Sequence, residues 1–157
     1  MKGWDGVSGE RGRTDEGHGD EVTSVCTSPD GSHIISGSYD KTVKIWDALT
    51  GSCVRTLEGH GDEVTSVCTS PDGSHIISGS LDKTVKVWDA FTGSCLRTLA
   101  GQGDEVTSVC TSPVGSHIIS GSFDKTVKVW DALISSSLLT LPTHGKEVTS
   151  VFTSPDA

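Results

Sequence analysis

The stretch that decides the fold is Gly59–Ala100, which reads GHGDEVTSVCTSPDGSHIISGSLDKTVKVWDAFTGSCLRTLA. The preceding stretch, Gly17–Glu58, repeats it with five differences: Tyr39/Leu81, Ile45/Val87, Leu49/Phe91, Val54/Leu96 and Glu58/Ala100. A Trp-Asp pair recurs every 42 residues, at Trp4, Trp46, Trp88 and Trp130. A period of about 40–45 residues indicates a repeat architecture, in which each copy is one supersecondary unit that needs its neighbours.

The repeat divides the 157 residues into five segments. Three whole copies occupy residues 17–58, 59–100 and 101–142. Residues 1–16 correspond to the degenerate end of a preceding copy, and we expect them to be irregular because their apolar positions are lost. Residues 143–157 begin a further copy, with a first strand predicted over Glu147–Thr153.

Within each copy, β-favouring runs are separated by turn residues. In the first copy the predicted strands are Glu21–Ser28, His33–Ser38, Thr42–Asp47 and Cys53–Leu57. The turn after the first strand has proline second and glycine fourth, as a type I turn prefers, and Tyr39-Asp40-Lys41 forms a second tight turn. Four short strands without an intervening helix predict an all-β fold of four-stranded antiparallel meanders.

Composition narrows the class of protein. The formal net charge is −9, and an acidic protein is poorly suited to coat nucleic acid phosphates or anionic lipid, so we expect neither nucleic acid nor membrane partners. No apolar run approaches the roughly 18 residues of a membrane span, and the first residues, MKGWDG, lack the apolar stretch of a signal peptide. We expect a soluble, cytoplasmic protein.

The five cysteines occupy two positions of the repeat: Cys26, Cys68 and Cys110, and Cys53 and Cys95. An odd number that arises by copying does not indicate a disulfide framework. The sequence has no Cys-x-x-Cys motif and no Cys/His cluster at zinc spacing, so we predict no metal site. Reduced, small, apolar core cysteines are expected.

The motifs GH, SPDG and SGSxDKTVKIWD, set at the 42-residue period, resemble the repeats of WD-repeat β-propellers across nearly the whole chain. This resemblance implies propeller blades, in which four-stranded sheets pack side by side around a channel. Closed propellers have about four to eight blades. Since the chain holds fewer whole copies, we expect an incomplete ring or open arc.

The resemblance also implies a buried hydrogen-bonded set in each copy. It comprises a histidine between blades, a serine of the second strand, the aspartate of the next turn and the tryptophan of the third strand. By motif position the sets are His18, Ser36, Asp40 and Trp46; His60, Ser78, Asp82 and Trp88; and Gln102, Ser120, Asp124 and Trp130. Gln102 departs from the family pattern, as does the missing aromatic residue before each Ser-Pro turn, where Thr27, Thr69, Thr111 and Thr153 stand.

Serine, histidine and aspartate also form catalytic triads, so a propeller hydrolase or lyase is the alternative from another class. A triad needs an exposed nucleophile beside an oxyanion hole and a pocket. Here the trio recurs in every copy beside an indole N–H, which favours a structural role. We therefore expect no enzyme activity, no catalytic residue and no cofactor.

The resemblance places protein contacts on the face that carries the turn before each aspartate. The first-ranked contact residues are the variable Tyr39, Leu81 and Phe123, and beside them lie Glu21, Thr23, Glu63, Thr65, Glu105, Thr107, Glu147 and Thr149. Apolar anchors rimmed by glutamates suit a peptide that offers Arg or Lys and an apolar side chain. Neutral variation at solvated turns is the alternative.

The predicted function is a non-catalytic scaffold for protein–protein interaction. The runner-up is the detached recognition part of a larger NTPase-linked signalling protein, because the highly similar repeats resemble those of such proteins. Three explanations of the incomplete ring stay open: the chain is a fragment of a longer propeller protein, it closes the ring by self-association, or it is a degenerate gene product that folds poorly. We favour the fragment.

Overall fold

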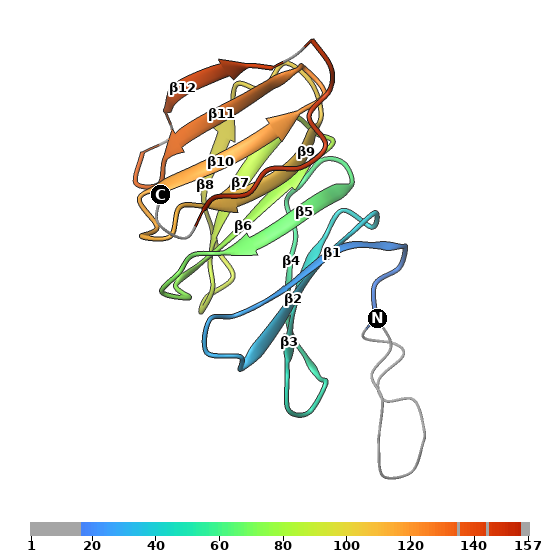
Figure 1. Cartoon of the computed structure of the whole chain (residues 1–157). Helices are drawn as coiled ribbons and strands as arrows, with labels where there is room; N and C mark the ends of the chain where they lie inside the picture. The colour runs from blue at the N-terminus through green and yellow to red at the C-terminus, as the bar shows by residue number, and fades with distance from the viewer. Residues whose placement is uncertain (1–16, 135, 144, 155–157) are drawn as a thin grey trace.

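The computed structural model describes residues 17–134, 136–143 and 145–154. These residues form three sheets of four consecutive antiparallel strands (Figure 1), which confirms the predicted all-β meanders. None of the described residues forms a helix that is long and apolar enough to cross a membrane. The predicted degenerate copy over residues 1–16 lies outside the described residues.

Each sheet follows the chain order. The first contains β1 (Val22–Thr27), β2 (His33–Ser38), β3 (Val43–Asp47) and β4 (Cys53–Leu57). The second contains β5 (Val64–Thr69), β6 (His75–Ser80), β7 (Thr84–Asp89) and β8 (Cys95–Ala100). The third contains β9 (Val106–Thr111), β10 (His117–Ser122), β11 (Thr126–Asp131) and β12 (Ser137–Pro142). In the first sheet the observed strands differ from the predicted ones by at most one residue at an end.

The sheets lie side by side, with β1 against β5 and β5 against β9. Each apolar core is shared between two sheets. The first core combines Ile35, Val43, Ile45 and Leu57 with Val64, Val67, Ile76 and Trp88 of the second sheet. The second combines Ile77, Val85, Val87 and Leu99 with Val106, Val109, Ile118 and Trp130 of the third. An isolated sheet of this size would leave its apolar face in water, so the repeats stabilise one another.

A glycine in the second strand of each sheet lets the next copy approach closely. A Cβ at Gly79 would lie 2.7 Å from Val106 Cγ1 and 3.0 Å from Val109 Cγ1. Gly37 receives Val64 and Val67 in the same way. The glycine is therefore a socket for two valines of the following copy, and any side chain there would displace them.

Threonines at irregularities in the innermost strands connect the sheets by hydrogen bonds. The pairing of β1 with β2 shifts register around Thr23, whose hydroxyl donates to Gly37 O at 3.2 Å and to Val64 O at 2.6 Å. Thr65 donates to Gly79 O and Val106 O in the second sheet. Bulges redirect side chains in this manner, and here they direct a hydroxyl toward the neighbouring sheet.

The prediction of a first strand over Glu147–Thr153 is wrong, because residues 147–154 form no strand. The segment nevertheless lies against the third sheet: Val148 N–H donates to Ser122 O at 3.0 Å, and Val151 N–H donates to Ser108 Oγ at 3.1 Å. Val148 and Val151 pack at Gly121. A strand requires a ladder with a partner, whereas these contacts are isolated bonds and side-chain packing.

Replacing Gly79 by Ala tests the socket. We expect Gly79→Ala to lower the free energy of unfolding by about 1–3 kcal/mol, because overpacking forces the valines of β9 to move. Urea denaturation followed by circular dichroism measures this change. Gly61→Ala is the matched control, since a Cβ there meets only Asp82 Cβ at 3.9 Å. Equal denaturation midpoints for the two variants would contradict the socket.

Candidate functional site

Each copy contains a largely buried carboxylate that accepts four hydrogen bonds, as Asp40 shows. Its Oδ1 accepts from the backbone N–H and the hydroxyl of Thr42, at 2.9 and 2.6 Å. Its Oδ2 accepts from His18 Nδ1 at 2.8 Å and from Gly19 N–H at 2.9 Å. The carboxylate thereby fastens the β2–β3 turn to the segment that precedes β1.

From this carboxylate a line of hydrogen bonds runs to the core. Trp46 Nε1–H donates to Ser36 Oγ at 2.8 Å, and the Ser36 hydroxyl donates to His18 Nε2 at 2.6 Å. Because Nε2 accepts, the histidine proton lies on Nδ1, which donates to Asp40. The partners of His18 thus determine its tautomer, and every polar side-chain group of the set has a hydrogen-bond partner.

The second and third sets have the same connectivity. His60, Ser78, Asp82 and Trp88 repeat it with distances of 2.7 and 2.8 Å. In the third set the Ser120 hydroxyl donates to Gln102 Oε1 at 2.6 Å, and Gln102 Nε2 donates to Asp124 Oδ2 at 2.9 Å. An amide replaces the imidazole here because it too has an acceptor toward the serine and a donor toward the aspartate.

The hydrogen bonds determine the ionisation of the set. Burial disfavours a charged Asp40, but the hydrogen bonds from Thr42, Gly19 and His18 outweigh it and lower its pKa to about 2. The pKa of Asp82 and that of Asp124 are lowered against burial in the same way. Burial lowers the pKa of His18. At neutral pH the first set therefore pairs an ionised Asp40 with a neutral His18 imidazole.

The serines of the sets are unsuited to attack a substrate. Ser36, Ser78 and Ser120 are fully buried, and each hydroxyl accepts a hydrogen bond from tryptophan while it donates to histidine or glutamine. A catalytic nucleophile needs an open position next to an oxyanion hole. The arrangement can hold polar groups inside the fold and fix the turn that follows.

The structure brings the first-ranked contact residues next to glutamates. Tyr39 N–H donates to Glu21 O at 2.9 Å, and the same bond joins Leu81 to Glu63 and Phe123 to Glu105. Tyr39 and Phe123 are each 38% exposed, whereas Leu81 is half-buried.

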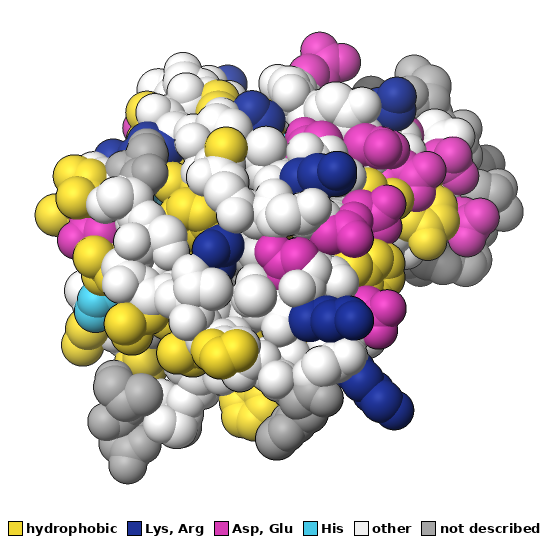
Figure 2. Space-filling model, turned by 90° about the horizontal axis from the view of Figure 1, so that it is seen from above, with side chains coloured by type: hydrophobic (Ala, Val, Ile, Leu, Met, Phe, Trp, Pro, Cys, Tyr) yellow, Lys and Arg dark blue, Asp and Glu magenta, His cyan; other side chains and the backbone are white. Residues whose placement is uncertain are grey.

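These turns belong to one face, which we term the acidic face. It comprises the three turn residues and the acidic pairs before β1, β5 and β9: Tyr39, Leu81, Phe123, Asp20, Glu21, Asp62, Glu63, Asp104 and Glu105. β1 and β5 begin at the right of Figure 1, and Figure 2 shows acidic side chains gathered on that side. The acidic face thus combines negative charge with exposed aromatic rings.

The predicted contact threonines have another role in the structure. The hydroxyls of Thr23, Thr65 and Thr107 each bond a carbonyl of the following copy, at Val64, Val106 and Val148. Each hydroxyl proton is therefore used in a bond between copies. Glu147 and Thr149 are exposed in the segment that packs on the third sheet.

Two cysteine positions differ in their surroundings. Burial raises the pKa of the Cys26 thiol to about 11 and raises the pKa of Cys68 and of Cys110, as expected for inert thiols near the core. Cys95 is exposed and Cys53 half-buried, in the outer strands β8 and β4, so the core prediction is wrong for Cys95. None of the described cysteines is in a disulfide, and no described His, Cys, Asp and Glu residues form a metal-binding group.

Sequence reasoning missed two cavities between the sheets, on the face opposite the acidic one. The first, of about 190 Å³, is lined by Thr69, and the second, of about 370 Å³, by Thr111. The sequence does contain an indication of these cavities. Thr69 and Thr111 stand where the WD-repeat pattern has a larger, aromatic residue.

Removing the central carboxylate should unfold the set. We expect Asp82→Ala to lower the free energy of unfolding by about 1–3 kcal/mol for each buried donor that loses its partner. Asp82→Asn should lose less, because the amide keeps one acceptor oxygen. Denaturant titration measures both. Glu58→Ala, at an exposed carboxylate, is the control, and an equal loss there would argue against the role of Asp82.

The Asp40 set also predicts an acid dependence of stability. The folded pKa of about 2 lies below the usual aspartate value of about 3.9, so the ionised form favours the folded state. This contribution is fully present above about pH 4 and is lost as the pH falls toward about 2. Denaturation midpoints measured across that range should drop more steeply for the wild type than for Asp40→Asn. Parallel curves would contradict the assignment.

Comparison with known proteins places this geometry. The WD40 family (WD domain, G-beta repeat) matches residues 9–47, 51–89 and 93–131. The chain is similar to a solved structure described as the crystal structure of RRP9 WD40 repeats, with a TM-score of 0.82 and 28% identity over 85% of this chain and 42% of that chain. It is similar to the structure of U3-55K with the same TM-score and identity, over 85% of this chain and 43% of that one.

The chain thus spans less than half the length of these two solved chains. No curated protein matches it. The family matches take in most of the chain, and the three sheets have the fold of the solved WD40 repeats. This chain therefore belongs to the WD40 repeat family.

Proposed function

We propose that the chain is a non-catalytic scaffold that binds a partner protein through the acidic face. The observation that carries the proposal is the backbone bond from each variable turn residue to a glutamate, as in Tyr39 to Glu21. The bond recurs at Leu81 and Phe123 while the residue changes. Variation therefore alters the exposed side chain and leaves the fold around it unchanged.

The chemistry of the acidic face selects the kind of partner. Tyr39 and Phe123 offer partly exposed rings, and aromatic anchors dominate the energetics of many interfaces. The neighbouring carboxylates attract cations and raise the rate of encounter with basic segments. A peptide that combines Arg or Lys with an apolar side chain fits both features.

Two observations support a binding role over catalysis. The serines that could act as nucleophiles are fully buried. Each of them is held by a tryptophan N–H, as Ser78 is by Trp88. The near identity of the first two copies also favours the runner-up, in which this face is the recognition part of a larger NTPase-linked signalling protein.

A peptide array tests the proposal. Immobilised peptides carry a central Leu flanked by Arg, Lys, Ser or Glu, and bound protein is quantified at low and high salt. We expect Arg- and Lys-flanked peptides to bind best, with binding that weakens between about 50 and 300 mM salt as screening increases. The Tyr39→Ala/Phe123→Ala double variant should bind about tenfold more weakly, the loss of roughly one anchor contact.

Leu49→Ala is the matched control, since Leu49 is 95% exposed and follows β3 at the opposite face. It should bind like the wild type. Preference for Glu-flanked peptides, or undiminished binding by the double variant, would overturn the proposal.

A further inference from the structure

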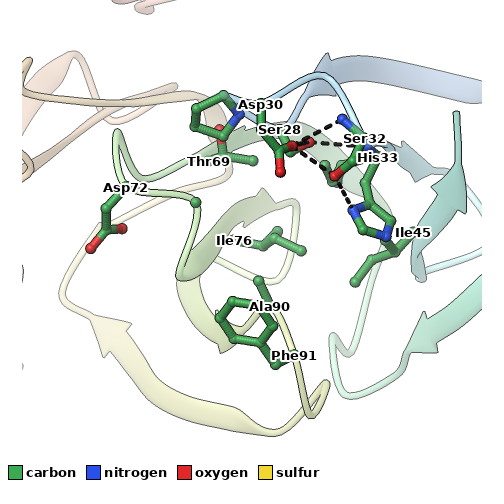
Figure 3. Close-up of a pocket in the computed structure, with 13 residues that line it drawn as sticks. Ser28, Asp30, Ser32, His33, Ile45, Thr69, Asp72, Ile76, Ala90 and Phe91 are labelled. Atoms are coloured by element: carbon green, nitrogen blue, oxygen red, sulfur yellow. Dashed lines mark hydrogen bonds between the residues drawn. The ribbon is translucent and has the colours of Figure 1, made fainter.

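The first cavity lies between the first and second sheets, at the face formed by the turns of residues 28–32 and 70–74. We term this the Ser-Pro face. Its apolar wall consists of Ile35, Ile45, Ile76, Ala90 and Phe91. In Figure 3, Ile76, Ala90 and Phe91 lie centrally, with Asp30 and His33 on one side and Asp72 on the other. Phe91 is 72% exposed, so an aromatic ring stands open at the mouth.

The cavity exists because a short side chain stands between two sheets held at a fixed distance. Thr69 lines it, and its hydroxyl reaches only Thr27 O at 3.4 Å. The two Ser-Pro turns touch where Gly73 meets Pro29, whose Cδ lies 3.4 Å from the place of a Cβ. That contact closes one side of the cavity, so a ligand would enter past Phe91.

The rim of the cavity is negative. Asp30 and Asp72 are among its lining residues, and no Lys or Arg is. Asp30 Oδ1 accepts from Ser28 Oγ, Ser32 N–H and Ser32 Oγ at 2.7 to 2.9 Å. Its Oδ2 has no partner in the described part of the chain, so this oxygen is free to accept from a ligand.

The second cavity provides an internal comparison. Between the second and third sheets, Val87 replaces Ile45, Leu133 replaces Phe91, and Val114 stands at the position of Asp72. This cavity is larger, about 370 Å³ against 190 Å³, and its lining includes one carboxylate and no phenylalanine. Of the two cavities, only the first therefore combines a phenylalanine ring with two carboxylates.

We propose that the first cavity is a second binding site, which takes an aromatic side chain that adjoins an Arg or Lys in a partner polypeptide. The site is separate from the acidic face and does not depend on the function proposed there. The ring enters between Ile45 and Phe91, and the neighbouring cation lies at Asp30.

Size and chemistry support this occupant. An apolar cavity of about 150 Å³ holds benzene in another protein, so 190 Å³ accommodates one phenyl ring. Phe91 can pack edge-to-face or offset against that ring, a geometry that adds to the gain from burial. A cation beside the ring is attracted by the Asp30 carboxylate. A purely apolar ligand would make no use of the unpaired Asp30 Oδ2.

Calorimetric titration with three capped peptides tests the proposal on the full chain. Their central segments are Arg-Phe-Arg, Arg-Ala-Arg and Glu-Phe-Glu. We expect the first to bind at least about tenfold more tightly than either of the others, because each lacks one of the two contacts. Equal binding of the three, or no binding of Arg-Phe-Arg, would overturn the proposal.

Matched variants locate the site. Thr69→Phe fills the first cavity from within and should weaken Arg-Phe-Arg binding by about tenfold or more, whereas Thr111→Phe fills only the second cavity and should change it less than about twofold. Asp30→Asn, which keeps the turn oxygen, should weaken binding and reduce its salt dependence. Leu49→Ala, at an exposed residue that lines neither cavity, should leave it unchanged. Equal losses in Thr111→Phe or Leu49→Ala would refute the location.

Circular dichroism at the titration temperature establishes that each variant is folded. If Thr69→Phe does not fold, Phe91→Ala replaces it, because Phe91 lines the first cavity and not the second. Unchanged binding of Arg-Phe-Arg by Phe91→Ala and Asp30→Asn together would refute the site without reference to the filled variant.

Discussion

The structure depends on the hydrogen bonds that one aspartate in each copy accepts, at Asp40, Asp82 and Asp124. Asp82 accepts hydrogen bonds from His60, Gly61 and Thr84. His60 and Gly61 belong to the segment before β5, whereas Thr84 begins β7. Because the aspartate is ionised and accepts four hydrogen bonds, it holds the turn against the segment that precedes β5. The line of bonds to Trp88 extends this order into the apolar core. One local interaction thus aligns the turn, the inter-sheet connection and the core.

Packing between sheets explains why the two candidate surfaces differ in character. At the acidic face, hydrogen bonds such as that from Thr23 to Val64 O connect neighbouring copies directly. Sequence variation between copies is found at exposed side chains such as Tyr39. At the Ser-Pro face the sheets are held apart by the same spacing, but Thr69 does not fill the gap. The acidic face therefore offers protruding side chains to a partner, whereas the Ser-Pro face offers a cavity with carboxylates at its rim. The same repeat offers partners two kinds of contact.

The repeat period and the turn residues made most of the fold predictable. Pro29 and Gly31 placed one turn, Asp40 another, and the strands between them followed within a residue. Features that depend on contacts between copies were less accessible. The hydroxyl of Thr23 reaches a carbonyl 41 residues away, the amide of Gln102 reproduces an imidazole, and a cavity depends on the spacing of two sheets. Local patterns carry no information on such distances, and the bond from Thr23 to Val64 was not foreseen.

The contact between copies has a direction: the glycine of one copy always receives the valines of the next, as Gly79 receives Val106. Duplication or loss of one 42-residue copy re-creates the same contact between neighbours, because each copy carries the same glycine on one side and the same two valines on the other. The number of repeats can change in a lineage without compensating substitutions in the core. Selection on such an array can act on its length and on the turn residues separately, and the near identity of neighbouring copies is what recent duplication would leave.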